Sequence, residues 1–130
     1  MSSAASVTHA SPIHRVRATS IALWVVQIAV AGMFLLAGGS KLLGASPMVS
    51  MFDAIGIGQW FRYVTGLIEV GSALALLTPR FAAFGALTLV ATMIGAIATH
   101  VLIIGGSPVA PAILLLGSAT VAIARRHELF

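Results

Sequence analysis

Cysteine is absent from the sequence, which excludes a structural disulfide, a thiolate metal site and Cys-x-x-Cys redox chemistry on this chain. Electron transfer would therefore require a partner protein or a borrowed cofactor. Charged residues are also scarce: they make up 8% of the 130 residues, whereas a soluble domain carries about 25%. Hydrophobic residues make up 59%. A single small domain with so little polar surface suits lipid better than water, so the composition predicts an integral membrane protein.

The few charges are distributed in a way that is typical of membrane topology. Seven lysines and arginines stand against three acidic residues, Asp53, Glu69 and Glu128. The basic residues lie near the chain ends and at the edges of apolar runs rather than in one patch, so no nucleic-acid partner is predicted. A cytoplasmic N-terminus places five basic residues inside and two outside, which favours cytoplasmic N- and C-termini. The inner five are Arg15, Arg17, Arg80, Arg125 and Arg126, and the outer two are Lys41 and Arg62.

Four apolar segments predict an all-α fold, an integral membrane four-helix bundle. They cover residues 19–43, 61–77, 80–104 and 109–124 of a transmembrane domain over residues 18–126. A spanning helix needs about 20 residues. The first and third segments are therefore long enough, and the second and fourth are short.

The regions outside the predicted bundle are short. We expect residues 1–17 to form a mobile cytoplasmic tail and residues 127–130 to form a C-terminal tail. A signal peptide also places basic residues before an apolar run. However, the run from Ile21 to Leu36 exceeds the roughly 7–15 residues of a signal-peptide core, so we expect it to be retained.

A serine or threonine precedes a proline at four places where a helix is expected to begin. Proline suits the first helical turn, and the hydroxyl can cap a free backbone N–H. The pairs are Ser11-Pro12, Ser46-Pro47, Thr78-Pro79 and Ser107-Pro108. Thr78-Pro79 predicts that the third helix starts directly after the second, and Gly105-Gly106 predicts where the third helix ends.

Apolar residues recur at helical spacing between the first two predicted spans, at Met48, Met51, Phe52 and Ile55. This spacing predicts a short helix that lies in the membrane interface. An ordinary loop that packs its apolar side on the bundle is an equally good interpretation.

Glu69 is the clearest candidate for a functional group, because charged residues inside a span typically face the bundle interior. Glu69 lies roughly eight residues, or about 12 Å, from the outer end of the second predicted helix. Small or polar residues share its face of the helix, which predicts a close helix contact there. These residues are Arg62, Thr65, Gly66, Ser72 and Ala73.

Lys41 and His100 are expected to converge with Glu69. Side chains lean toward the N-terminus of their own helix, and the first and third helices run opposite to the second. The three titratable groups are therefore the candidate catalytic and ligand-binding residues, with Thr65 and Ser72 as further ligand-binding candidates. Matching faces are predicted at Gln27, Ala31, Phe34, Gly38 and Lys41 of the first helix and at Thr88, Thr92, Gly95 and Thr99 of the third.

Structural roles stand as alternatives for these residues. Lys41 can extend to the outer interface, and His100 can be a hydrogen-bonded packing residue. Glu69 can fix the helix register by pairing with Lys41 or Arg62. Gln27 and the threonines are expected to form hydrogen bonds between helices. No metal site is predicted, because only one histidine lies inside a span.

Three segments resemble the DoxX-like family of small membrane proteins. The first is the run Gly32-Met33-Phe34-Leu35-Leu36-Ala37-Gly38-Gly39-Ser40-Lys41-Leu42, a glycine and an apolar stretch followed by Gly-x-x-Lys. The others are Gly66-Leu67-Ile68-Glu69-Val70-Gly71 and Pro79-Arg80-Phe81-Ala82-Ala83. The resemblance covers about residues 20–105. It implies a four-helix bundle in the bacterial inner membrane, and some members are similar to quinone-reducing thiosulfate oxidoreductase subunits or accompany redox enzymes.

The residues and the resemblance together support three functional hypotheses. The leading one is an accessory membrane subunit that docks to a larger redox-linked complex and borders a quinone or lipid pocket. The alternative is a small oligomeric proton-linked carrier or channel in which Glu69 takes up and releases a proton. The third is a membrane enzyme that uses Lys41, Glu69 and His100, although the isolated chain is expected not to be an enzyme.

The expected partners are membrane lipid and either a larger membrane protein complex or further copies of the chain. No cofactor is expected to be held by the chain itself, and a bound quinone or lipid is the expected ligand.

Overall fold

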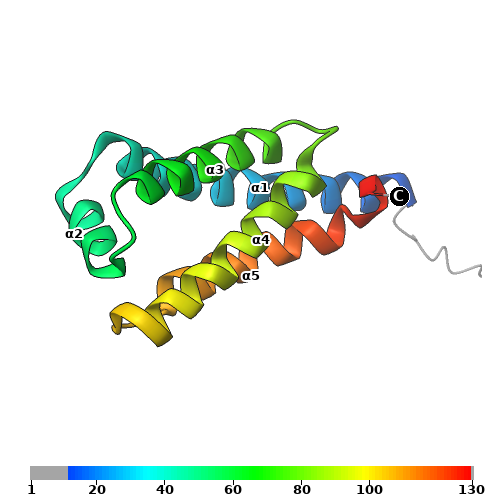
Figure 1. Cartoon of the computed structure of the whole chain (residues 1–130). Helices are drawn as coiled ribbons and strands as arrows, with labels where there is room; N and C mark the ends of the chain where they lie inside the picture. The colour runs from blue at the N-terminus through cyan, green and yellow to red at the C-terminus, as the bar shows by residue number, and fades with distance from the viewer. Residues whose placement is uncertain (1–11, 130) are drawn as a thin grey trace, which may run out of the picture.

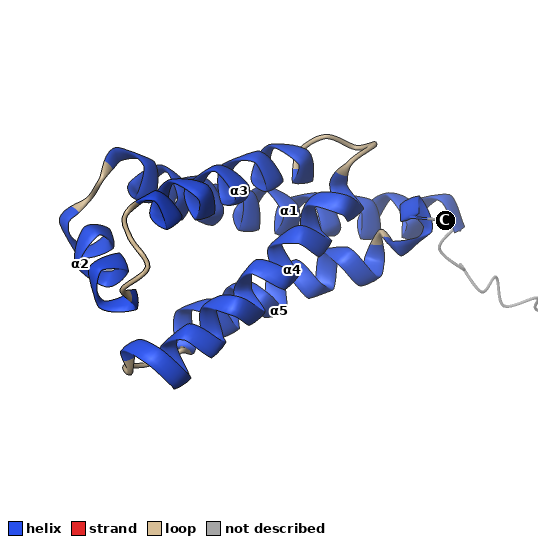
Figure 2. Cartoon of the chain, in the orientation of Figure 1, coloured by secondary structure: helices blue, strands red, loops and turns tan. Residues whose placement is uncertain are grey.

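The computed structural model describes residues 12–129, and over these residues the chain is helical without a strand, as predicted. A π-helical turn η1 (His100–Ile104) continues α4, and a 3₁₀ turn η2 (Arg126–Leu129) follows α5. Figure 2 shows that the helices are joined by loops. The five α-helices are α1 (Pro12–Leu43), α2 (Ser46–Ile55), α3 (Trp60–Leu76), α4 (Ala82–Thr99) and α5 (Val109–Ala124).

The long helices form two pairs. The most extensive contacts join α1 to α3 and α4 to α5, and α3 also packs along α4. In Figure 1 the α4/α5 pair crosses the α1/α3 pair at an angle, and α2 lies at the end where the pairs separate. Because α2 contacts both α3 and η1, it spans this open end of the molecule. The end of α5 lies beside the start of α1 (Figure 1).

Two of the long helices are long and apolar enough to cross a membrane. They are Ala18–Leu43 of α1 and Ala82–Ile104, which combines α4 and η1. Val109–Ala124 is a shorter apolar helix. These lengths agree with the expectation that the first and third segments are the comfortable spans.

Several helix boundaries differ from the predicted ones. The first helix begins at Pro12 rather than near Thr19, because Pro12 suits a first helical turn and no proline interrupts the chain before Leu43. Residues 12–17, which were expected to belong to the tail, are therefore helical, whereas residues 1–11, with Ser11 of the first Ser-Pro pair, lie outside the described residues.

The Ser/Thr-Pro pairs have different roles. Ser107 lies one position before Pro108, the cap residue of α5, and its hydroxyl accepts a hydrogen bond of 3.3 Å from the N–H of Val109, the first residue of the helix. Thr78 instead donates to the carbonyl oxygen of Leu74 at 3.0 Å, so its hydroxyl secures the end of α3 and α4 begins only at Ala82. Ser46 makes no side-chain cap, and Ala45 occupies the cap position of α2. The prediction that these two hydroxyls cap the following helices was wrong.

Residues 46–55 form a helix rather than a loop, with the apolar side turned inward. Phe52 is buried and its ring meets that of Phe61 edge-on at 5.8 Å between centroids. Gly56 ends the helix in a left-handed conformation, with φ of 86°, and its N–H donates to the carbonyl of Phe52. The third predicted helix ends at Gly105 as expected, where a positive φ of 70° is combined with an extended ψ of −172°.

Glycines allow the α1/α3 contact to be very close. A Cβ added to Gly38 would lie 3.0 Å from the carbonyl oxygen of Gly66, and a Cβ added to Gly66 would lie 3.0 Å from that of Gly38. The predicted inward faces of α1 and α3 are confirmed, because both helices bury their small and polar stripes here. The buried members are Gln27, Ala31, Phe34 and Gly38 of α1 and Arg62, Gly66, Glu69, Ser72 and Ala73 of α3.

Candidate functional site

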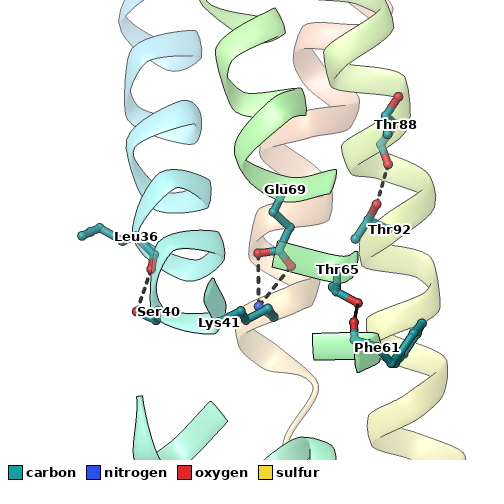
Figure 3. Close-up of polar contacts among 8 residues, drawn as sticks. All are labelled: Leu36, Ser40, Lys41, Phe61, Thr65, Glu69, Thr88 and Thr92. Atoms are coloured by element: carbon teal, nitrogen blue, oxygen red, sulfur yellow. Dashed lines mark hydrogen bonds and ion pairs between the residues drawn. The ribbon is translucent and has the colours of Figure 1, made fainter. Parts of the chain in front are cut away.

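An ion pair between α1 and α3 forms the centre of the candidate site. The Nζ atom of Lys41 lies 3.1 Å from each carboxylate oxygen of Glu69. Figure 3 shows the two side chains pointing toward one another from their separate helices. The Glu69 side chain is 2% exposed and the Lys41 side chain 12% exposed. Glu69 therefore pairs with Lys41, and neither lysine nor carboxylate stands alone in the protein interior.

The glycine contact explains why these two side chains meet. Lys41 follows Gly38 by three positions, and Glu69 follows Gly66 by three positions. Residues three apart occupy the same face of a helix. Because the two helices run in opposite directions, Lys41 and Glu69 lie one turn away on opposite sides of the point where the two backbones touch. Each side chain leans toward the N-terminus of its own helix, and therefore toward the other, so the close approach of the helices lets the ammonium reach both oxygens.

A cavity of about 420 Å³ opens beside the ion pair. Its walls are mostly apolar and come from all five α-helices, including the inner side of α2 with Met48, Met51 and Phe52. The polar groups that line it are Lys41, Thr65, Glu69, Thr92, Thr99 and His100. Ligand pockets typically measure about 300–1,000 Å³ and combine apolar walls with a few polar groups. The cavity has the size and composition of a small ligand site.

His100 lines the same cavity but makes no hydrogen bond to the ion pair among residues 12–129. Its Nδ1 lies 2.8 Å from the carbonyl oxygen of Ala96 in the preceding turn. His100 is also the first residue of the π-helical turn. Single π-helical turns are uncommon and frequently occur at functional sites. The three titratable groups predicted to converge therefore share one cavity, with the pair and the imidazole as separate parts of its wall.

The two further ligand-binding candidates lie in different places. Thr65 lines the cavity, and its hydroxyl donates to the carbonyl of Phe61 at 2.8 Å (Figure 3). Ser72 does not line the cavity, because it is buried one turn beyond Glu69, where its carbonyl oxygen packs on Gly85 of α4. A Cβ on Gly85 would lie 2.6 Å from that oxygen, so Ser72 belongs to a helix contact.

The threonines do not join the helices as expected. Thr88, Thr92 and Thr99 each donate to a carbonyl four residues earlier in their own helix, at distances of 2.8–2.9 Å (Figure 3 includes the Thr92 bond). The prediction of interhelical hydrogen bonds from these residues was wrong, because α4 buries a different face. That face consists of Ala82, Ala83, Gly85, Ala86, Leu89 and Met93.

Comparison with known proteins identifies the family. The DoxX-like family matches the chain over residues 25–125, which covers most of the described helices. The chain belongs to the DoxX-like family. The resemblance found in the sequence is therefore confirmed, and the matched region contains Lys41, Glu69 and His100. Neither a curated protein nor a solved structure matches this DoxX-like chain.

Arg62 supports the site of this DoxX-like protein in a way that the sequence did not indicate. It is 5% exposed, and its guanidinium donates to the carbonyl oxygen of Lys41 at the end of α1. Its Nε donates to the side-chain oxygen of Gln59 at 2.7 Å. A cation at a helix C-terminus is stabilised by the unpaired carbonyls there. Arg62 therefore fixes the backbone that carries Lys41, rather than pairing with Glu69.

A second polar cluster lies at the opposite end of the helices. Gln27 on α1 donates to the carbonyl oxygen of Leu76 at 3.0 Å and accepts a hydrogen bond of 3.0 Å from Nε of Arg125. Glu128 accepts one from the N–H of Ala83 at 3.2 Å. Gln27 was correctly predicted to bond between helices. Its Arg125 partner follows it by 98 positions, and no pattern in the sequence relates the two residues.

Proposed function

We propose that this membrane protein binds a small apolar molecule with a polar head, a quinone or a lipid, in the cavity beside Lys41 and Glu69. The observation that supports this proposal is the cavity itself, where a buried ion pair forms one wall of an otherwise largely apolar space. Thr65, Thr92, Thr99 and His100 on its wall are half-buried rather than sealed, which leaves a route for a ligand.

We further propose that α1, α3, α4 and α5 span the bacterial inner membrane as a four-helix bundle with cytoplasmic ends. The 17 residues of α3 rise about 26 Å, which approaches the roughly 30 Å of a bilayer core. Large apolar side chains point outward from several helices: Leu36 is 74% exposed, Leu102 79% and Leu116 70%. Soluble proteins rarely expose such extensive apolar surface, whereas lipid accommodates it.

In this proposal the protein acts as an accessory subunit of a larger redox-linked complex. Its own chemistry is limited, since the sequence has no cysteine and, within residues 12–129, no three metal-ligating side chains come together. A bound quinone would have to exchange electrons with a partner protein. The protein can be purified from native membranes in mild detergent and analysed by mass spectrometry. Bound small molecules test the proposed ligand, and bound proteins test the proposed partner complex.

Two glycine variants make this test specific to the cavity. Gly95 lines the cavity and Gly71 does not, and a Cβ on either residue would meet nothing within 4 Å. Gly95→Leu should fill part of the cavity and reduce the amount of ligand that co-purifies. Gly71→Leu, the control, should leave it unchanged. If ligand recovery is the same in both variants, the bound molecule does not occupy this cavity.

The alternative function is a proton-linked carrier or channel. It is favoured by one observation, the burial of Glu69 at a cavity whose wall also includes His100. Reconstitution in liposomes with a pH-sensitive dye distinguishes the two functions. A carrier should move protons in this assay and lose that activity in Glu69→Gln. A ligand-binding subunit should show no such flux.

A further inference from the structure

We infer that the cavity selects an uncharged amphiphile with a hydroxyl head group over charged amphiphiles and over those that only accept hydrogen bonds. This inference rests on the proposed ligand-binding function and adds the chemistry of the head group. It follows from the charges and the hydrogen-bonding groups on the cavity wall.

The charges on the wall compensate each other. The positive charge of Lys41 lies 3.1 Å from both oxygens of Glu69. An anionic head group that approached the ammonium would also approach the carboxylate, and a cationic head group near Glu69 would also approach Lys41. Such repulsion is strong where water is excluded, and each charged head would also lose its hydration. Both signs of charge are therefore disfavoured, and an uncharged head group remains.

The imidazole of His100 provides a hydrogen-bond acceptor. Its Nδ1 lies 2.8 Å from the carbonyl oxygen of Ala96, and a carbonyl can only accept, which assigns the ring proton to Nδ1. In the neutral ring this leaves Nε2 as an acceptor. Over residues 12–129 the structure gives Nε2 no hydrogen-bond partner.

The threonine hydroxyls add further acceptors. Thr65, Thr92 and Thr99 line the cavity, and each uses its only O–H to bond a carbonyl of its own helix. Their oxygens keep lone pairs that can accept. The ammonium of Lys41 instead keeps a free donor, because it has three N–H groups and Glu69 offers it two oxygens. The wall thus combines several acceptors with one remaining donor.

A hydroxyl group complements this wall, since it donates one hydrogen bond and accepts others. A ketone, ester or ether can accept from Lys41 but leaves Nε2 of His100 unpaired. A volume of about 420 Å³ accommodates the head and the first part of one chain or a single ring, at the small end of the range for ligand sites. Among the proposed ligands, those with a hydroxyl are therefore expected, a single-chain lipid alcohol or a reduced quinone (a quinol), and an alkylphenol is a suitable probe. The oxidised quinone, which only accepts hydrogen bonds, is disfavoured.

The inference can be tested by competition against a photoreactive alkylphenol in detergent-solubilised protein. The competitors share one alkyl chain and differ only in the head: hydroxyl, methyl ether, carboxylate or ammonium. One hydrogen bond to a buried group contributes about 1 kcal/mol, so the alcohol should compete ~5-fold better than the ether. Labelling should also fall in Gly95→Leu and not in Gly71→Leu, which shows that the probe occupies the cavity.

The His100→Phe variant tests the role of the imidazole. The ring shape is kept and the acceptor is removed, so the preference for the alcohol over the ether should shrink several-fold. The exposed His127 is the matched control, and His127→Phe should leave the preference unchanged.

The outcomes separate this inference from the proposed function. If the carboxylate or the ammonium compound competes as well as the alcohol, the inference is wrong although the cavity still binds a ligand. The inference is also wrong if the ether competes as well as the alcohol for the wild-type protein. This result does not depend on whether the His100→Phe variant is stable. If labelling is identical in Gly95→Leu and the wild type, the cavity does not bind the probe and both proposals fail.

Discussion

Breaking the Lys41–Glu69 pair from one side should be far more damaging than replacing both partners. The ammonium lies 3.1 Å from both oxygens of a carboxylate that is 2% exposed. At an effective dielectric of about 20, charges at this separation attract by about 5 kcal/mol, and the desolvation of both groups offsets much of this. Removal of one partner leaves the other charge buried and uncompensated, which typically costs about 3–5 kcal/mol.

A double-mutant cycle measures this coupling. Lys41→Met and Glu69→Leu keep roughly the volume of each side chain, and each should lower the thermal stability of the protein in mild detergent. The double variant should recover much of the loss, because an apolar pair of similar size needs no compensation. We expect a coupling energy of about 2–3 kcal/mol between the two sites. Arg126→Met, which removes an exposed positive charge, is the control and should have little effect.

The cycle also distinguishes packing from function. If the two single effects simply add, the residues are not coupled, and Lys41 serves as an anchor at the interface rather than as the partner of Glu69. If the double variant is stable but no longer binds the ligand, the pair is needed for recognition as well as for folding. Stability and ligand binding should therefore be measured on the same samples.

Two further predictions concern topology and helix packing. Because the chain has no cysteine, single cysteines can be introduced at Ala45, Gly106 and His127 and labelled with an impermeant reagent in intact cells. The first two should react and the third should not; strong labelling at position 127 would reverse the orientation. Gly66→Ala places a methyl group 3.0 Å from the carbonyl oxygen of Gly38 and should lower stability by about 1–3 kcal/mol. Gly71→Ala meets open space, so an equal loss in thermal unfolding would refute the proposed close contact.

The helices of this protein could be predicted from its sequence because each one is specified locally. Apolar runs, prolines and glycines set the positions of all four long helices and the end of the third, since helical hydrogen bonds form within one segment. The small-residue stripe around Glu69 also identified the buried face of α3 correctly. On α4 the same reasoning failed: threonines and small residues are both compatible with a helix contact, and only packing against α3 and α5 selected the alanine face.

The candidate site could be identified partly from the sequence, but its contacts were decided by the tertiary structure. Its candidates could be found in the sequence because a carboxylate, an ammonium and an imidazole are unusual in apolar segments. Their partners were decided by the tertiary structure: Lys41 pairs with Glu69, Arg62 bonds the end of α1, and His100 bonds its own helix.

Long-range contacts explain what the sequence could not indicate. The periodicity of α2 showed that it has an apolar side, but not that this side closes the cavity, because that depends on how far the two helix pairs separate. Gln27 meets Arg125 across 98 positions only after both helix pairs have assembled. Local patterns determine which segments are helical and which faces are apolar. The distances between segments, and therefore the cavity and its polar wall, arise from the packing of the whole bundle.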